Sequence, residues 1–225
     1  MKGKVVFVTG TDTDVGKTWA SVALMRAWQA KGYVVAGMKP VAAGCVERGG
    51  RLVNDDAERL RQHASVELPY EWVNPYAFKM PVSPHLACGE VQIELSLIDD
   101  RLRSVRDQAE VVIIEGAGGW FSPLDNLHLN ADLARNLDVP VLLVVGLRLG
   151  CINHALLSWH AIKDYGLRPA GWLAVVIDPR MSGLQSNIHF LQQHLGSPPV
   201  AVLPNLPAPD WSCLAAQIEL DMLKL

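Results

Sequence analysis

The sequence predicts an α/β fold in which helices cover both faces of a mostly parallel sheet. Short apolar runs alternate along the chain with segments of helical period, as in repeated strand–helix–strand units. Half of the 225 residues are hydrophobic, and a chain of this length can bury such a sheet in one core. We therefore expect a single α/β domain over residues 1–225.

Six runs rich in Val, Ile and Leu are the expected strands. They cover residues 5–8, 34–38, 111–114, 141–145, 173–177 and 200–203. Segments with apolar residues at helical spacing separate these strands. The expected helices cover residues 17–30, 56–63, 96–108, 131–136, 153–165 and 184–194.

Residues 66–90 interrupt this alternation with prolines and aromatic residues. Long irregular segments inside compact domains are often lids or binding loops. A structural flap that packs its aromatic side chains on the domain edge is the other interpretation. The sequence leaves both open.

Composition excludes several classes of protein. Twenty Lys and Arg against 23 Asp and Glu give a net charge of -3 without a basic run, so we expect no nucleic-acid partner. Four widely spaced cysteines indicate thiols in a reducing compartment. The apolar run at 5–8 is too short for a signal peptide, and no run approaches the roughly 20 residues that span a bilayer. We expect a cytoplasmic protein with no membrane partner.

The strongest functional signal is a strand, a Gly- and Thr-rich loop and a helix start at residues 5–20, VVFVTGTDTDVGKTWA. Backbone N–H groups at such a helix start bind phosphate oxygens. Lys17 then reaches the β- and γ-phosphates, and the Thr18 hydroxyl is a ligand for Mg²⁺. The motif departs from G-x-x-x-x-G-K-T, because Thr11 stands where a glycine is expected. The context still predicts a P-loop NTPase-type fold.

Glu115 is the second signal, since it follows the apolar run 111–114 and precedes what we expect to be a glycine-rich turn. Ligands of open α/β sheets gather at the carboxyl ends of the strands. Glu115 is therefore expected beside the P-loop, where it can bind Mg²⁺ directly or through water. The alternative is a solvated acid at a strand end.

Three further residues have both a structural and a functional interpretation. Asp56 lies in a run, Asn54 to Asp56, of which one residue is expected to cap a helix, but Mg²⁺ in nucleotide sites commonly needs an additional carboxylate. Lys39 follows the second strand, and Asn153 opens a helix. A solvated lysine and a helix cap are the simpler interpretations, and contacts with anionic substrates are the functional ones.

Five stretches carry a resemblance to a known family. They are VTGTDTDVGKT (8–18), AGMKPVAAG (36–44), NPYAFKMPVSPHLA (74–87), EGAGGWFSPL (115–124) and VVGLRLGCINHALL (144–157). In this order they resemble the dethiobiotin synthetases of biotin biosynthesis over nearly the whole chain. The resemblance implies that 7,8-diaminononanoate, CO₂ (or bicarbonate) and ATP give dethiobiotin, ADP and phosphate, with Mg²⁺ required. In the family a carbamate forms on one amine, accepts the γ-phosphoryl group and is closed to a ureido ring by the second amine.

The resemblance also implies residue roles. Lys17 and Lys39 are the expected catalytic residues, because they neutralise phosphate and carbamate charge. Thr18, Asp56 and Glu115 are the expected metal ligands. The implied ATP contacts are Asp14, Val15, Gly16, Lys17, Thr18, Trp19, Asp56, Glu115, Gly116, Ala117, Gly118, Val175, Pro204, Asn205 and Leu206. The implied substrate contacts are Thr11, Lys39, Ala43, Gly150, Cys151 and Asn153.

In the family, the turn corresponding to residues 150–153 reaches across a twofold interface, so a homodimer is expected. Two positions depart from the family pattern. Ala43 stands where a serine is common, which removes a substrate hydroxyl contact. Val175 stands where an asparagine is usual, which alters recognition of the base.

Two other functions remain open from the sequence. One is another P-loop amide-forming ligase or kinase, which would need a nitrogen source or a different acceptor. The other is a regulatory ATPase of the partition or cell-division type. Proteins of that type have an extra lysine early in the P-loop, where this chain has Thr11, Asp12 and Thr13.

Overall fold

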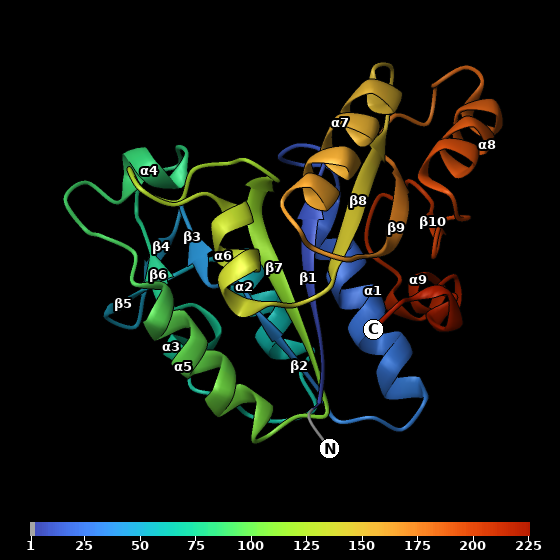
Figure 1. Ribbon diagram of the computed structural model, residues 1–225. Helices are drawn as coiled ribbons and strands as arrows, with labels where there is room; N and C mark the ends of the chain where they lie inside the picture. The colour runs from blue at the N-terminus through green and yellow to red at the C-terminus, as the bar shows by residue number, and fades with distance from the viewer. Residues whose placement is uncertain (1–2) are drawn as a thin grey trace.

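The computed structural model describes residues 3–225 and contains a six-stranded sheet (Figure 1). Its strands are β1 (Lys4–Gly10), β2 (Val35–Met38), β7 (Val111–Gly119), β8 (Val141–Leu147), β9 (Pro169–Val176) and β10 (Val202–Leu203). Their order across the sheet is β10-β9-β8-β1-β7-β2, and all neighbours run parallel. This confirms the expected P-loop α/β fold, with β1 near the centre.

Helices cover both faces of this sheet (Figure 1). One face carries α1 (Lys17–Ala30) and α9 (Trp211–Ala216), with α2 (Asp55–Gln62) beside α1. The other carries α5 (Leu95–Arg106), α6 (Asn130–Leu137), α7 (Cys151–Asp164) and α8 (Leu184–Leu195). Side chains alternate across a strand, so Val6 and Val8 of β1 join the core under α1, while Val5 and Phe7 join the core on the opposite face.

The chain between β2 and α5 folds into several short elements at the β2 edge of the sheet (Figure 1). They are β3 (Val41–Ala42), β4 (Val46–Arg48), β5 (Arg51–Val53), α3 (Tyr70–Val73), β6 (Tyr76–Ala77) and α4 (Pro84–Ala87). β4 and β5 form an antiparallel hairpin, and β3 pairs with β6. The segment 66–90 is therefore ordered and buries Tyr70, Val73 and Phe78. A short 3₁₀ helix, η1 (Leu220–Met222), lies near the carboxyl terminus.

β7 extends further than its apolar run suggests. Its glycine-rich end stays in the sheet, because Gly119 still pairs with Gly10 of β1 after a bulge. The expected turn after Glu115 is therefore wrong. Glu115 lies inside the strand and is fully buried, so the alternative of a solvated acid is also wrong.

Two helix starts also bear on the site. Asn54 caps α2, since its side-chain oxygen accepts hydrogen bonds from the backbone N–H groups of Asp56 and Ala57, both at 3.1 Å. α7 begins two residues earlier than expected, with Gly150 at the N-cap. Asn153 is consequently a residue of the first helical turn and not the cap.

Across residues 3–225, no helix has both the length and the apolar character needed to cross a membrane. All four cysteines are free thiols in the structure, as expected, and only Cys213 is exposed.

Candidate active site

The P-loop joins the carboxyl end of β1 to α1. Gly16 is the N-cap of α1 and has a φ of 88°, a conformation that side-chain-bearing residues rarely adopt. A Cβ at Gly16 would also lie 2.8 Å from Cγ1 of Val175, which is buried on β9. Both the backbone angle and the close approach of β9 therefore require glycine at the start of α1.

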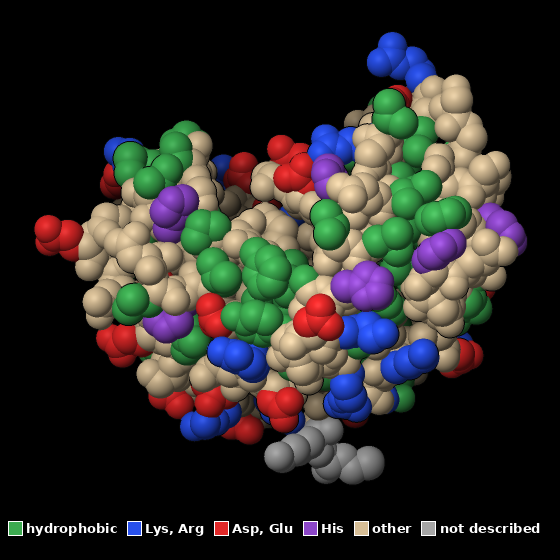
Figure 2. Space-filling model, turned by 45° about the horizontal axis from the view of Figure 1, so that its top comes forward, with side chains coloured by type: hydrophobic (Ala, Val, Ile, Leu, Met, Phe, Trp, Pro, Cys, Tyr) green, Lys and Arg blue, Asp and Glu red, His purple; other side chains and the backbone are tan. Residues whose placement is uncertain are grey.

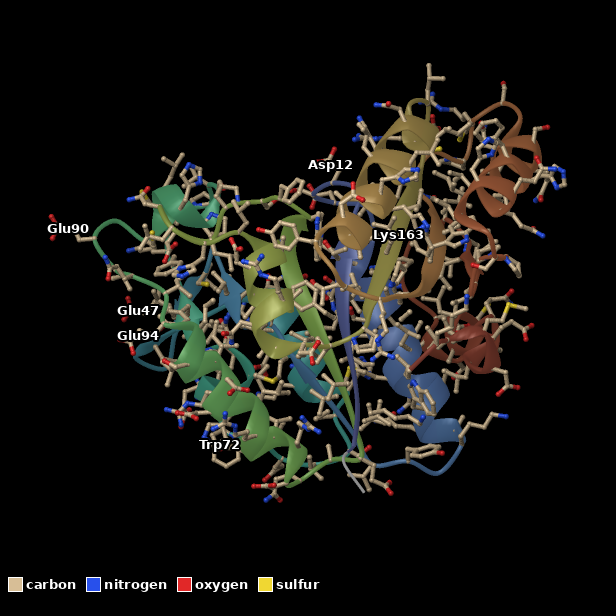
Figure 3. All side chains as sticks on the ribbon, in the orientation of Figure 1. Asp12, Glu47, Trp72, Glu90, Glu94 and Lys163 are labelled. Carbon is tan, nitrogen blue, oxygen red and sulfur yellow. The ribbon has the colours of Figure 1, made fainter. Side chains whose placement is uncertain are left out.

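Lys17 folds back over the loop that precedes it. Its Nζ donates a hydrogen bond to the backbone oxygen of Asp12 at 2.8 Å. The Asp12 side chain itself pairs with Arg148, which follows β8. Figure 3 shows Asp12 at the carboxyl end of the sheet, far from the labelled acidic residues Glu47 and Glu90. The P-loop is thus tied to the segment between β8 and α7.

Strand register brings Lys39 and Glu115 together. Met38 of β2 pairs with Ile114 of β7, so the residues that follow them are lateral neighbours. Lys39 Nζ lies 2.6 Å from Glu115 Oε1 and 3.0 Å from Oδ2 of Asp56, which extends from the first turn of α2. The three predicted side chains form one cluster beside the P-loop, in which Lys39 and Glu115 are buried and Asp56 is partly exposed.

The pKa values of the two lysines shift in opposite directions. Burial would lower the pKa of Lys39, but the carboxylates of Glu115 and Asp56 outweigh it and raise that pKa above its ordinary value. Burial, and then the positive charge of Lys39, lower the pKa of Lys17 to about 8. Burial opposes ionisation of Asp56, yet Lys39 holds the pKa of Asp56 below its usual range.

The donor set fits Mg²⁺. Thr18 Oγ1 donates to Glu115 Oε1 at 2.9 Å, while the buried Oε2 of Glu115 has no partner among residues 3–225. A buried carboxylate oxygen without a partner is costly, and a hard cation held by a hydroxyl and one or two carboxylates would satisfy it. Within residues 3–225, no group of three or more His, Cys, Asp or Glu side chains is arranged so that it could hold a metal ion. The remaining ligands of a magnesium ion here would be phosphate oxygens and water.

Two adjoining cavities open at this edge of the sheet. The first, of about 280 Å³, is lined by the P-loop and by Lys39, Asp56 and Glu115. The second, of about 480 Å³, is lined mainly by residues 42–44 and 81–84. Thr13, Asp14, Lys39, Asp56 and Gly118 line both, so the two form one cleft. Figure 2 shows the molecule hollowed between the α4 side and the α7 side.

The predicted nucleotide contacts fall into two groups. Those lining the first cavity are Asp14, Gly16, Lys17, Thr18, Trp19, Asp56, Glu115 and Gly118. The others lie beneath or beside it. Val15 packs under the loop, Gly116 packs on Phe7, Ala117 lines the second cavity, and Val175 lies under Gly16. Pro204, Asn205 and Leu206 follow β10, where Asn205 Nδ2 donates to Ile177 O at 3.5 Å.

The predicted substrate contacts are also divided. Lys39 and Ala43 line the second cavity. Thr11 Oγ1 instead accepts a hydrogen bond from the Gly146 backbone at 3.4 Å. Gly150 and Asn153 are exposed at the start of α7, and Cys151 is buried there. None of these four lines either cavity of the cleft.

Segment 66–90 supports the site through hydrogen bonds that the sequence did not specify. Asn74 Nδ2 donates to the backbone oxygen of Lys39 at 2.7 Å, and its own oxygen accepts from the Tyr70 hydroxyl at 3.0 Å. The same hydroxyl accepts from the Asn54 backbone at 2.7 Å. One network therefore holds both Lys39 and the start of α2, while residues 81–84 of the segment line the cleft. Both interpretations of the segment, as a binding loop and as a structural flap, are consistent with this.

Asn130, the first residue of α6, is a second supporting residue that sequence reasoning missed. Its Nδ2 donates to the oxygen of Gly119 at 2.9 Å and also to that of Ala117, and its Oδ1 accepts from the Ala117 N–H at 3.2 Å. These bonds fix the glycine-rich end of β7. An asparagine at a helix start is too common for its sequence position to reveal this role.

Comparisons with known proteins agree with this geometry. A family model described as "AAA domain" matches residues 4–212. Solved structures with a similar fold include the MinD cell division protein of Aquifex aeolicus, with a TM-score of 0.58, 15% identity and coverage of 98% of this chain and 95% of MinD. The signal recognition particle receptor FtsY of Elizabethkingia anophelis has a TM-score of 0.54 at 17% identity, over 90% of this chain and 57% of FtsY. At such identities the likeness shows a shared P-loop fold.

Curated relatives are much more similar. The ATP-dependent dethiobiotin synthetase BioD of Ralstonia nicotianae is 44% identical over 96% of this chain and 96% of its own length. The protein of the same name from Xanthomonas campestris is 45% identical over 98% of this chain and 99% of its own length. Similarity of this extent over full-length chains, together with the P-loop and the cluster of Lys39 and Glu115, shows that the chain belongs to the family of ATP-dependent dethiobiotin synthetases.

Proposed function

We propose that this enzyme converts 7,8-diaminononanoate, CO₂ and ATP into dethiobiotin, ADP and phosphate. The observation that carries the proposal is the position of Lys39. This residue lines both the cavity of about 280 Å³ beside the P-loop and the cavity of about 480 Å³ that we assign to the organic substrate. A phosphoryl group passing from one substrate to the other would cross this junction.

Phosphoryl transfer depends on positioned charge more than on a protein nucleophile. We assign Lys17 to the β- and γ-phosphates of ATP, because it lies at the helix start that binds phosphate. We assign Lys39 to the carbamate oxygens and to the γ-phosphoryl group, since its pKa keeps it charged at neutral pH. Neither lysine needs to give up a proton in these roles.

Thr18, Asp56 and Glu115 would hold Mg²⁺. When bound, the ion would neutralise charge on the phosphate oxygens. The support for this assignment is the unpartnered Oε2 of Glu115 beside the Thr18 hydroxyl.

The second cavity supports the assignment of the organic substrate. The 42–44 loop and residues 81–84 give it a wall with several apolar side chains, which suits the methylene chain of a diamino acid. We further propose that Gly150, Cys151 and Asn153 bind the carboxylate of a substrate held by a second copy of the chain. Because the reaction uses ATP, we expect it to take place in the cytoplasm.

The test is incorporation of labelled bicarbonate into an acid-stable product. Label should enter the product only when both diaminononanoate and ATP are present, and one ADP should form per product. A Lys17→Gln control should incorporate none. ATP cleavage that incorporates no label and requires glutamine or ammonia with another acid would instead indicate a different amide-forming ligase. ATP cleavage stimulated by DNA or lipid alone would indicate a regulatory ATPase.

A further inference from the structure

Arg59 lines the first cavity together with residues of the P-loop, although no sequence motif identifies it. It is on α2, three residues after Asp56, and residues at this spacing share a helix face. Both side chains line the first cavity with Lys17, Thr18 and Trp19. His63, the C-cap of α2, contacts the ring of Trp211 with centroids 5.0 Å apart, so the end of α2 packs against α9. The first turns of α2 border the cavity through Asp56 and Arg59.

Two other arginines near α2, Arg48 and Arg61, are engaged by carboxylates, and Arg59 differs from them. Arg61 makes two bonds with Glu58, at 3.0 and 2.7 Å, and Arg48 pairs with Asp55 at 2.7 Å. Within residues 3–225, no Asp or Glu lies within 4.0 Å of the Arg59 guanidinium, and no acceptor is bonded to it. Its donors are available to a ligand in the cavity.

The two lysines of the cavity are already bonded to protein atoms, so a polyphosphate would favour a further cation beside it. Lys39 is bonded to two carboxylates, Glu115 and Asp56, so much of its charge is compensated. Lys17 is the remaining lysine, and it bonds a backbone oxygen of its own loop. A polyphosphate carries several negative charges along its length. The forked, permanently charged guanidinium of arginine suits the bidentate geometry of phosphate oxygens.

We propose that Arg59 binds the polyphosphate of the nucleotide from the α2 side of the cavity. This inference rests on the proposed ATP-dependent function and adds a binding residue to it. A contact made equally with ATP and ADP stabilises the ground state and the transition state alike. Loss of Arg59 should therefore raise the KM for ATP and leave kcat nearly unchanged.

The test compares Arg59→Ala with Arg61→Ala, which removes the same charge from the same helix but from a side chain engaged by Glu58. Equilibrium binding of ADP with Mg²⁺ should weaken on the order of tenfold or more in Arg59→Ala, as expected for a charged hydrogen bond. It should change less than about twofold in Arg61→Ala. Arg59→Lys should restore part of the affinity. Far-ultraviolet circular dichroism would establish that α2 remains folded in each variant.

Binding of inorganic tripolyphosphate and of adenosine identifies the part of the nucleotide that Arg59 contacts. The same loss is expected for tripolyphosphate, and none for adenosine. A loss shared by adenosine would overturn the proposal in favour of a contact with the base or ribose, and equal ADP affinities for Arg59→Ala and Arg61→Ala would overturn it outright. If the wild-type chain bound no ADP, the proposed function itself would be wrong, which separates the two failures.

Discussion

Lys17 and Lys39 line one cavity, but their environments differ in one respect that decides their pKa values. Lys39 has two carboxylate partners, whereas Lys17 bonds only a backbone oxygen and has Lys39 as a neighbour. Burial therefore prevails at Lys17 and carboxylates prevail at Lys39. At neutral pH both are charged, but Lys17 is the one that loses its proton in an accessible range.

We expect ADP affinity to fall as the pH rises above about 8, the pKa of Lys17 in the free chain. Bound phosphate favours the charged lysine, so the complex keeps a proton that the free chain has lost. Binding must then take up a proton, and affinity decreases by up to about tenfold per pH unit. Below pH 8 both states are protonated, so affinity should be flat down to about pH 7, where phosphate still has its full charge.

Calorimetric titrations of ADP in buffers of different ionisation enthalpy would measure this proton uptake directly. Lys17→Arg is the matched variant, because a guanidinium stays charged over the whole range. Its affinity should not decline above pH 8. An equal decline in the wild type and in this variant would assign the titration to another group.

The magnesium assignment gives a second prediction for single residues. Glu115→Gln and Asp56→Asn should each shift the magnesium titration of activity to higher concentrations, because a neutral amide oxygen is a poorer ligand for a hard cation than a carboxylate. The shift should be larger for Glu115, which is fully buried and has an unpartnered oxygen. Asp55→Asn, at an exposed position beside Asp56, is the control. Titrations that coincide with the wild type in both site variants would place the metal ligands elsewhere.

At the scale of elements, α2 is a short helix that carries both Asp56 and Arg59 and depends on its cap. Asn54→Ala should lower the free energy of unfolding by about 1 kcal/mol, which is the usual value of an N-cap. In a chain of this size that corresponds to a fall in Tm of roughly 2–4 °C. Asn54→Asp keeps an acceptor for the N–H groups of Asp56 and Ala57 and should retain most of the stability. Calorimetry that gives the two variants the same Tm would contradict a capping role.

The end of β9 and the chain after β10 suggest weak selection among nucleoside triphosphates. Val175 presents methyl groups against Gly16, and Asn205 is bonded to the Ile177 backbone. An apolar wall separates ligands of similar shape by only about 1–3 kcal/mol. We therefore expect kcat/KM for CTP, GTP and UTP to lie within about a hundredfold of that for ATP. A larger preference for ATP, measured at the same magnesium concentration, would mean that other groups read the base.

For the whole molecule, the sequence was most informative where a residue's environment is set locally. The central strands are buried on both faces and are therefore continuously apolar, so their positions and the carboxyl-edge location of Lys39 and Glu115 could be predicted. β3 to β6 are too short to have a pattern of their own and depend on tertiary contacts. Three supporting residues could not be predicted in this way. Asn74 and Asn130 bond to the backbone of other elements, and Arg59 lines a cavity that several elements form. Nothing in the local sequence of these residues distinguishes them.

At the scale of the whole molecule, a twofold dimer would bring the start of α7 of one chain to the cleft of the other. One exposed face of α7 carries Asn153 and Leu157, and Leu127 and Phe121 are also exposed. Figure 2 shows hydrophobic side chains gathered over α6 and α7. Exposed apolar side chains gathered on one face suit an interface between two copies of the chain. In such a dimer Asn153 would serve the cleft of its partner.

A mixture of two inactive variants tests this arrangement. Lys17→Gln should disable the cleft of its own chain, and Asn153→Ala should disable the cleft of its partner. A mixed dimer then contains one intact cleft, made of Lys17 from one chain and Asn153 from the other. If the chains exchange freely, half of the dimers are mixed and each has one working site of two, so activity should return to roughly a quarter of the wild-type value. Each variant alone should stay inactive, and sedimentation should report dimers throughout. Activity that stays absent in a mixture with demonstrated chain exchange would mean that each cleft is completed within a single chain.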